Sequence, residues 1–449
     1  MKQKYYNLLE LFLIFIITLI FILVFHDLVD DEVWNYGFAY NVSTGLIPYR
    51  DFNMVTTPLY PMVDALFMKI FGQNIITHYI FCAIACTCIF SYIKKSNSKS
   101  YFLPYAILLL YAVPTYNIMC LLLLLIIINM EEKHSNDYLI GIILGLTFLT
   151  KQNTGIFLCI PTLFTKDIKK IVKRIVGFII PNIIILMYLI YNNALYQFID
   201  YCFLGIGEFA EKNILIRIPA LVVLIISIIY LIYKYIKTKN IEYIYLLCFF
   251  GMSYPLIDTF HVIIPFIPTL TYGLSDIKLN KKIISIAFII FTSTISIYNI
   301  YGYSSKGTYS FPNGTNTFKH RKIDDKSVKQ INILSSYVKN NGKNTFSIDD
   351  SGYLIKLENN DQIGRYDYFL TGNVGKNGEE KLIKDFNNIC QKENCTFILN
   401  DYAYNSNEYT QYNRKLHEYV VNNYKYSETI KEVGLQVYRN YEKKSDVSD

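Results

Sequence analysis

The chain has 449 residues, of which 52% are hydrophobic, a formal net charge of +7 and a mean hydropathy of +0.25. A soluble protein of this length would fold as one to three domains, but apolar blocks at residues 8–24, 75–92 and 221–233 exclude that class. The positive charge does not indicate a nucleic acid partner. Among the apolar blocks the basic residues concentrate in alternate loops, and the 21 Lys and Arg after residue 302 are mostly offset by acidic residues, as on an ordinary solvated surface.

Eleven membrane-spanning helices are predicted, because a span needs about 20 mostly apolar residues and only helices or closed barrels satisfy their backbone in lipid. They lie near residues 8–26, 75–93, 101–115, 117–130, 138–150, 154–165, 175–192, 216–233, 241–257, 262–275 and 283–301. The first block lacks a small-x-small cleavage site before His26 and is expected to remain as an uncleaved helix. The predicted fold class is an α-helical polytopic membrane bundle with about eleven spans.

The loops between these spans differ in charge and predict the orientation. One alternating set contains Lys2, Lys4, Lys94, Lys95, Lys99, Lys133, Lys166, Lys169, Lys170, Lys173, Arg174, Lys234, Lys237, Lys239, Lys278, Lys281 and Lys282. The opposite set contains only Arg50, Lys69, Lys151, Lys212 and Arg217. Short basic loops stay in the cytoplasm. The N-terminus is therefore expected inside, and the first outer loop at 27–74 and everything after the last span are expected outside.

Residues 302–449 are polar and are predicted to form a soluble extracytoplasmic α/β domain after a membrane module at 1–301. Helices are expected at 325–340, 377–392 and 409–424. Strands are expected at 344–348, 395–400 and 433–439. The domain contains no Gly-rich phosphate loop and no nucleophile elbow, so we expect it to bind acceptor or cover the site. Cys390 and Cys395 could form a disulfide if this domain is outside. The other seven cysteines are interpreted as packing residues, and no zinc pattern is present.

Three adjacent carboxylates, Asp30, Asp31 and Glu32, follow the first predicted span. Like charges at a membrane surface repel one another and lose hydration, which raises at least one pKa and suits a carboxylate to act as a general base. The alternative is an ordinary solvated loop end. Acidic residues contribute little to membrane topology, which weakens an interpretation as a topology marker.

The same outer loop continues with Arg50 and Asp51, near Trp34, the only Trp of the chain, and several Tyr. Trp and Tyr at a membrane interface also occur as plain anchors, which is the alternative for this loop. Residues 58–71 are too short and too charged to span a membrane. They are predicted to form an amphipathic helix on the outer surface.

Two further outer turns contain ionisable residues. Lys151 is an isolated cation between two apolar runs and is a candidate functional residue, with a lysine snorkelling to lipid headgroups as the alternative. Asp258 and His261 are three residues apart and share a face if the segment is helical. Such a pair can hold a charge on the imidazole and bind a phosphate, whereas the alternative is a solvated turn. The predicted topology places all these residues on one side of the membrane.

These segments resemble the GT-C superfamily of polyprenyl-phosphate-dependent glycosyltransferases, which includes the protein O-mannosyltransferases and the aminoarabinose transferase of lipid A. The residues that resemble it are Asp31, Glu32, Gly45, Pro48, Tyr49, Arg50, Asp51, Phe52, Pro58, Leu59, Tyr60, Gly145, Thr150, Lys151, Gln152, Asn153, Thr154, Gly155, Pro255, Asp258, His261 and Pro265. The resemblance covers most of residues 8–300. The additional Asp30 leaves open which carboxylate aligns with the catalytic acid of the family.

The resemblance implies an inverting transfer of a hexose or pentose from a polyprenyl-phosphate donor to an acceptor hydroxyl on the outer side of a bacterial plasma membrane. The acceptor is a glycan, a lipid or a protein. Asp31 is the expected base, with Glu32 orienting the acceptor or the base and Asp30 as a further catalytic candidate. The expected donor-phosphate ligands are Lys151, His261 and Arg50. The expected substrate-binding residues are Asp51, Tyr49, Gln152 and Asp258. No cofactor is required under this interpretation; a divalent metal is compatible with it but is not indicated, since no ligand cluster argues for one.

Three other functions are compatible with a polytopic chain. A polysaccharide polymerase or ligase would more often place paired Arg residues in large outer loops, and these loops contain only Arg50 and Arg217. A transporter would place ionisable residues near the middle of its spans and often has internal repeats, neither of which the sequence contains. A structural or docking protein is the third alternative.

Overall fold

The computed structural model describes residues 2–25, 30–96, 101–212, 214–275, 325–342, 344–348, 373–400 and 414–441. The chain divides into two compact units. Unit 1 consists of Met1–Gly45, Thr56–Tyr191 and Ile214–Lys306, and unit 2 consists of Leu46–Val55, Asn192–Asn213 and Gly307–Asp449. Unit 2 thus combines the C-terminal domain with two short segments that the sequence assigned to the membrane module. The predicted boundary between 301 and 302 lies outside the described residues.

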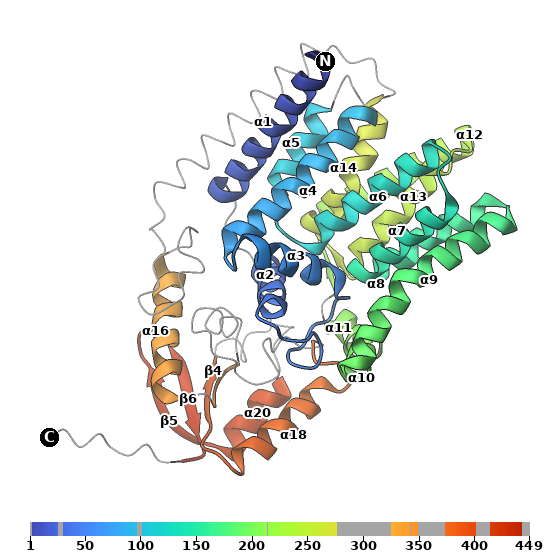
Figure 1. Ribbon diagram of the computed structural model, residues 1–449. Helices are drawn as coiled ribbons and strands as arrows, with labels where there is room; N and C mark the ends of the chain where they lie inside the picture. Colours follow the sequence, from blue (N-terminus) through green and yellow to red (C-terminus); the bar gives the residue numbers. More distant parts are fainter. Residues whose placement is uncertain are drawn as a thin grey trace. The chain divides into compact units, whose positions relative to one another are not determined.

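Unit 1 is helical, and ten of its described helices lie within or overlap the predicted spans. They are α1 (Lys2–Phe25), α4 (Ile75–Ser96), α5 (Phe102–Leu110), α6 (Tyr116–Glu132), α7 (Asp137–Thr150), α8 (Gln152–Cys159), α9 (Ile168–Tyr191), α12 (Ile218–Thr238), α13 (Glu242–Phe249) and α14 (Thr259–Ser275). Short 3₁₀ segments, Ile160–Thr165 and Phe250–Ser253, extend α8 and α13. Helices α1, α4, α6, α7 and α9 pack in that order, each against the next, and α12 packs on α13 and α14 (Figure 1). The predicted helix at 283–301 lies outside the described residues.

Within the described part of the chain, four helices are long and apolar enough to cross a membrane. They are α4, α9, α12 and residues 5–23 of α1. Their outer faces carry exposed aliphatic side chains, such as Ile183 on α9 and Ile229 on α12, as contact with lipid requires. Helix α7 and the segment Glu242–Ser253 are apolar but shorter. The helical, apolar class is confirmed, whereas the count of eleven spans stays a prediction.

Glycines let helices α7 and α9 approach closely. A Cβ atom on Gly141 would lie 2.2 Å from the carbonyl oxygen of Arg174, and one on Gly177 would lie 2.2 Å from that of Tyr138. Small residues four apart, here Gly141 and Gly145, are the usual means by which helices touch in a membrane. This packing buries Arg174, a residue that the sequence placed in a loop, inside α9.

The first predicted outer loop contains two helices, α2 (Asp30–Ser43) and α3 (Leu59–Phe71). Helix α3 confirms the helix expected at 58–71, but one of its faces is not a solvated surface. Asp64 on this face is fully buried and pairs with Nδ1 of His78 on α4 at 2.5 Å. The contact between α3 and α4 explains why this carboxylate does not face solvent.

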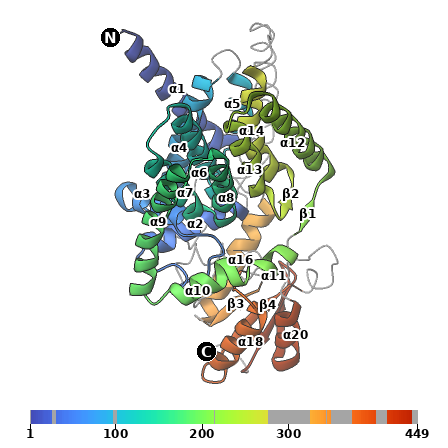
Figure 2. The same ribbon diagram turned by 90° about the vertical axis from the view of Figure 1, so that its right-hand side faces the viewer.

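Unit 2 contains a four-stranded mixed sheet of order β3-β4-β6-β5. Its strands are β3 (Thr345–Ser347), β4 (Thr396–Leu399), β5 (Lys425–Ile430) and β6 (Leu435–Arg439), and its helices include α16 (Asp325–Asn341), α18 (Gly378–Cys390) and α20 (Arg414–Asn423). Strand β3 runs parallel to β4, and both are labelled in Figure 2. Strand β6 runs antiparallel to both β4 and β5. The predicted helices and strands are all present. Strand β5 was missed because this edge strand is polar and mostly exposed.

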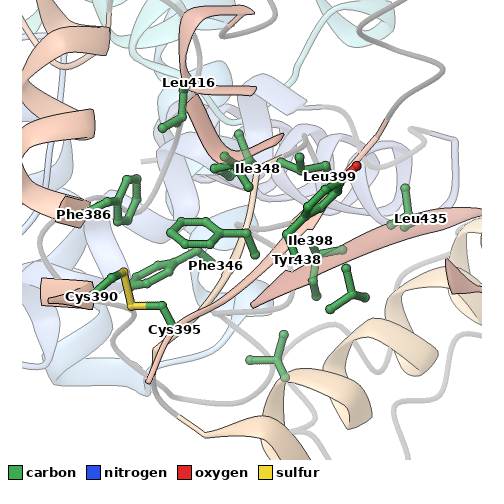
Figure 3. Packing of buried hydrophobic residues seen from close by; sticks show 14 of the residues in the cluster. Phe346, Ile348, Phe386, Cys390, Cys395, Ile398, Leu399, Leu416, Leu435 and Tyr438 are labelled. Atoms are coloured by element: carbon green, nitrogen blue, oxygen red, sulfur yellow. A yellow bond between two sulfur atoms is a disulfide. The ribbon is translucent and has the colours of Figure 1, made fainter. Parts of the chain in front are cut away.

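An aromatic core holds this sheet to its helices. The Phe346 ring centroid lies 4.6 Å from that of Phe386 and 5.4 Å from that of Phe397. Cys390 and Cys395 form a disulfide beside these rings (Figure 3). The pairing that the sequence left open is therefore present.

The segment from 192 to 213 packs within unit 2 through a buried acid. It forms α10 (Leu195–Ile199), a π-helical turn (Asp200–Leu204) and α11 (Ile206–Lys212). Asp200 is 3% exposed, accepts the backbone N–H of Lys376 at 3.1 Å and pairs with the ammonium of Lys381. Asn53, from the other short segment, donates to the Asn373 carbonyl at 3.3 Å. Both segments are thus fixed to the same stretch of the C-terminal domain.

Candidate functional site

Asp31 lies in the first turn of α2, and its side chain is half-buried. Its backbone carbonyl accepts a hydrogen bond from Nδ2 of Asn35 at 2.6 Å. The other end of the same amide, Oδ1, accepts the backbone N–H of Tyr116 at 3.3 Å. Asn35 thus ties α2 to the start of α6. Within the described ranges, no donor is hydrogen-bonded to the Asp31 carboxylate, so this group can accept a proton.

The charges around Asp31 come from two other parts of unit 1. Burial raises the pKa of Asp31 above its ordinary value of 3.8, while positive charge on His261 and Lys151 acts in the opposite direction and the Asp258 carboxylate raises the pKa further. The structure therefore brings together four residues that the sequence singled out. Asp31 lies at the start of α2, Lys151 at the α7–α8 junction, and Asp258 and His261 at the start of α14. Their catalytic and binding roles stay predictions.

Lys151 occupies an extended position between α7 and α8, with φ −153° and ψ 113°. Its Nζ donates to Oδ1 of Asn117 and to the carbonyl of Met252, both at 3.1 Å, and lies 5.1 Å from the centre of the Tyr116 ring. Burial lowers the pKa of Lys151 to about 8, although nearby Cys120 and Asp31 favour the ammonium. An ammonium has three N–H donors, so one remains for a ligand.

Asp258 caps the start of α14. Its Oδ1 accepts the backbone N–H of His261 at 2.8 Å, and both carboxylate oxygens lie 3.0 Å from Nδ1 of the same residue. Burial acts to raise the pKa of Asp258, but the hydrogen bond and charge of His261 hold it below its ordinary value. Ser253 donates to the His261 carbonyl at 2.9 Å and fixes this turn. The imidazole is 7% exposed.

Glu32 follows Asp31 directly but faces another part of the molecule. Successive residues of an α-helix point about 100° apart. The Glu32 side chain is fully buried and accepts a hydrogen bond from the hydroxyl of Tyr79 on α4. Glu32 thus helps to hold α2 against α4. Its expected role in orienting the acceptor stays a prediction. The side chain of Asp30 lies outside the described residues.

The remaining predicted residues lie in two places. Arg50 donates to Asp51 through Nε at 2.8 Å and through its second guanidinium nitrogen at 2.9 Å, within unit 2. Tyr49, also in unit 2, is fully buried and packs edge-on against Phe198 with centroids 5.1 Å apart. Gln152, in unit 1, is the first residue of α8 and is 8% exposed.

Sequence reasoning missed Asn35, Tyr116 and Asn117. Asn117 is fully buried and holds the Lys151 ammonium, and Tyr116 lies under the same ammonium. The available signal was weak: a polar pair at the beginning of an otherwise apolar helix, with no spacing that marks a motif. Across the part of the chain that the structure describes, no group of three or more His, Cys, Asp or Glu side chains is arranged to hold a metal ion.

The site therefore combines a proton acceptor with two groups that can bind an anion. A half-buried carboxylate can deprotonate a hydroxyl group held beside it. An ammonium and an imidazolium, fixed in a poorly solvated place, can stabilise negative charge that develops on a neighbouring ligand. Asp31, Lys151 and His261 provide these groups.

Comparison of the sequence with known protein families and with curated proteins found no match. Comparison of the structure with solved structures found matches. ArnT from Cupriavidus metallidurans in the apo state matches with a TM-score of 0.54 at 10% identity, over 98% of this chain and 99% of that chain. The same protein bound to undecaprenyl phosphate matches with a TM-score of 0.53 at 9% identity, over 97% and 98%. The chain thus shares the fold of ArnT over nearly its full length.

Proposed function

We propose that this protein is an integral-membrane glycosyltransferase that moves a sugar from a polyprenyl-phosphate donor to an acceptor hydroxyl. The observation that carries the proposal is the placement of a half-buried carboxylate, Asp31, within the electrostatic reach of buried Lys151 and of His261. The fold supports it, because ArnT has been solved with undecaprenyl phosphate bound. Each charged group has a defined task in such a reaction.

The carboxylate of Asp31 acts as the base. It takes the proton from the acceptor hydroxyl as the acceptor oxygen attacks the anomeric carbon from the face opposite the phosphate. A bond forms between that oxygen and the anomeric carbon, and the bond from the anomeric carbon to the phosphate oxygen breaks. The electron pair of the broken bond leaves with the lipid phosphate. The configuration at the anomeric carbon is therefore inverted.

Lys151 and His261 stabilise the leaving phosphate, which gains one negative charge as the bond breaks. The unused N–H of the Lys151 ammonium and the Nε2 side of the His261 ring face this charge. Two such cations serve in place of a divalent metal. Arg50 is kept as a further candidate ligand of the donor phosphate. Asp51, Tyr49, Gln152 and Asp258 are kept as candidate substrate-binding residues.

We place the reaction on the outer side of a bacterial plasma membrane, with the N-terminus in the cytoplasm and the C-terminal domain outside. The distribution of Lys and Arg among the loops supports this orientation. The disulfide between Cys390 and Cys395 agrees with it, because disulfides persist in oxidising compartments. The acceptor is a hydroxyl group of a glycan, a lipid or a protein.

A transfer assay tests the proposal. The full chain in lipid nanodiscs is incubated with a panel of radiolabelled polyprenyl-phosphate sugars and a membrane extract that supplies acceptors. We expect one donor to be consumed with release of free polyprenyl phosphate and with inversion at the anomeric carbon. Failure to consume any donor of the panel, or a product with retained configuration, would overturn the proposal.

A further inference from the structure

The amide of Asn117 is held in one orientation beside Lys151. Lysine can only donate hydrogen bonds, so the atom of Asn117 that faces Nζ at 3.1 Å must be the oxygen Oδ1. The other end of the amide, Nδ2, is buried and has no hydrogen-bond partner among the described residues. A buried donor without a partner costs about 1–3 kcal/mol. The cation site thus contains a second, neutral donor group that the protein itself leaves unused.

This donor lies at the start of α6, where other features also suit an anion. Backbone N–H groups at a helix N-terminus attract negative charge. The Thr115 side chain forms no cap at this end of α6, where Asn35 accepts the N–H of Tyr116. Because Oδ1 and Nδ2 share one carbon atom, an oxyanion that approaches the Lys151 ammonium comes near Nδ2 as well. Tyr116, the first residue of the helix, packs beneath the same ammonium.

We propose that Asn117 is a ligand of the leaving phosphate: Oδ1 holds the Lys151 ammonium, and Nδ2 donates a hydrogen bond to an oxygen of the phosphate that this ammonium binds. The inference rests on the proposed function and deepens it. Asn117 carries no charge, so its contribution is a directional hydrogen bond to the phosphate. Its Nδ2 donor gains a partner only when the phosphate is bound. Asn35 is hydrogen-bonded both to the Asp31 carbonyl and to the N–H of Tyr116. It thereby fixes the position of the base relative to the start of α6, where Asn117 lies.

Binding of undecaprenyl phosphate to the full chain in nanodiscs tests this inference without requiring turnover. Trp34 is the only Trp of the chain and lies on α2 three residues after Asp31, so its fluorescence reports binding. We expect Asn117→Leu and Asn117→Asp each to weaken binding at least tenfold. The matched control is Thr115→Val, because Thr115 is also buried with an unpartnered hydroxyl but lines a separate apolar cavity of about 150 Å³. The control should bind like the wild type.

The pH dependence of binding separates a ligand role from a general packing defect. The groups that face Lys151 are Asp31 from α2, Asp258 before α14, and Cys120 and Asn117 from α6. Wild-type binding should fall as pH rises through about 8, where Lys151 loses its proton. Asn117→Asp adds a negative charge and should move this midpoint to higher pH. Asn117→Leu removes an acceptor and should move the midpoint to lower pH, while Thr115→Val should leave it in place.

The possible outcomes separate the two proposals. Wild-type binding together with unchanged affinity and midpoint in Asn117→Leu and Asn117→Asp overturns the role of Asn117 alone. If Asn117→Leu does not fold, Asn117→Asp decides, because it keeps the size of the side chain and the acceptor for Lys151. Absence of undecaprenyl phosphate binding by the folded wild-type protein removes both the role of Asn117 and the donor class of the proposed function.

Discussion

Asp258 holds His261 from two directions, accepting its backbone N–H at 2.8 Å and lying 3.0 Å from its Nδ1. Because a carboxylate only accepts hydrogen bonds, Asp258 fixes the imidazole with a proton on Nδ1. The Nε2 side is left for another ligand. Within the described residues, nothing else is hydrogen-bonded to the ring. The pair thus holds the imidazole in one orientation within electrostatic reach of Asp31.

Replacing the partner of this imidazole should weaken donor binding more than catalysis itself. We expect Asp258→Asn to raise the KM for the polyprenyl-phosphate sugar about tenfold, which corresponds to about 1.4 kcal/mol. The matched control is Asp167→Asn, because Asp167 accepts the backbone N–H of Lys169 at 2.9 Å near the start of α9, away from the proposed site. Equal effects of both substitutions on donor KM would show that the charge pair has no special role.

Transfer should depend on pH through Lys151 and Asp31, in addition to the proton that His261 carries on Nε2 in the proposed step. Lys151 must keep its proton, and its pKa is lowered to about 8, so activity should fall as pH rises through about 8. Asp31 must lose its proton, and its pKa is raised by burial, so activity should fall on acidification at a pH above 3.8. Rates measured between pH 4 and 10 give both limbs.

The Lys151→Arg variant tests the assignment of the alkaline limb. A guanidinium stays charged throughout this pH range. The residual activity of the variant should therefore lose the limb near pH 8, even if its rate is lower because the shape differs. An unchanged alkaline limb in Lys151→Arg would assign that limb to another group.

Glu32 and Tyr79 should affect stability more than turnover. Tyr79→Phe removes a donor from a buried carboxylate and should lower the free energy of unfolding by about 1–3 kcal/mol. Glu32→Gln keeps an acceptor for the Tyr79 hydroxyl and should keep kcat within about threefold of the wild type. Loss of a true general acid or base would instead lower kcat by about 10²–10⁴-fold. A Glu32→Gln variant of normal stability without turnover would instead assign catalysis to Glu32.

The close contact of α7 and α9 should tolerate no added methyl group. A Cβ at residue 177 would lie 2.2 Å from the Tyr138 carbonyl, whereas one at Gly273 meets nothing nearer than 3.6 Å. We expect Gly177→Ala to reduce stability by about 1–3 kcal/mol, the usual cost of overpacking, and Gly273→Ala to have little effect. Thermal unfolding in one detergent compares the two variants. Equal unfolding temperatures of Gly177→Ala and Gly273→Ala would mean that α7 and α9 can move apart to accommodate the methyl group without loss of stability.

The sequence predicted the helices well because their signal is local. Apolar blocks marked the helices of unit 1, and the polar stretch after 302 contained the predicted α/β pattern. The grouping of Leu46–Val55 and Asn192–Asn213 with the C-terminal domain was not predicted. It depends on long-range contacts such as that of Asp200 with Lys376, which no local pattern encodes.

The candidate site was predictable only in part. Ionisable residues at predicted outer turns identified Asp31, Lys151 and His261, because an isolated charge between apolar runs is conspicuous. Asn117 was not identified, since a neutral amide at a helix start has many ordinary uses. The different directions of Asp31 and Glu32 also required the structure, because both lie in one acidic run and only the packing of α2 decides which side chain faces α4.

The most direct measurement is the rate at which free polyprenyl phosphate is released from the radiolabelled donor by the wild type and by Asp31→Asn, at equal amounts of folded protein. The carboxamide keeps the size of the side chain but cannot accept the proton, so the variant should lose at least 10²-fold in rate, a loss typical of a missing general base. Donor binding should change little. Wild-type release by Asp31→Asn would contradict the assignment of Asp31 as the base.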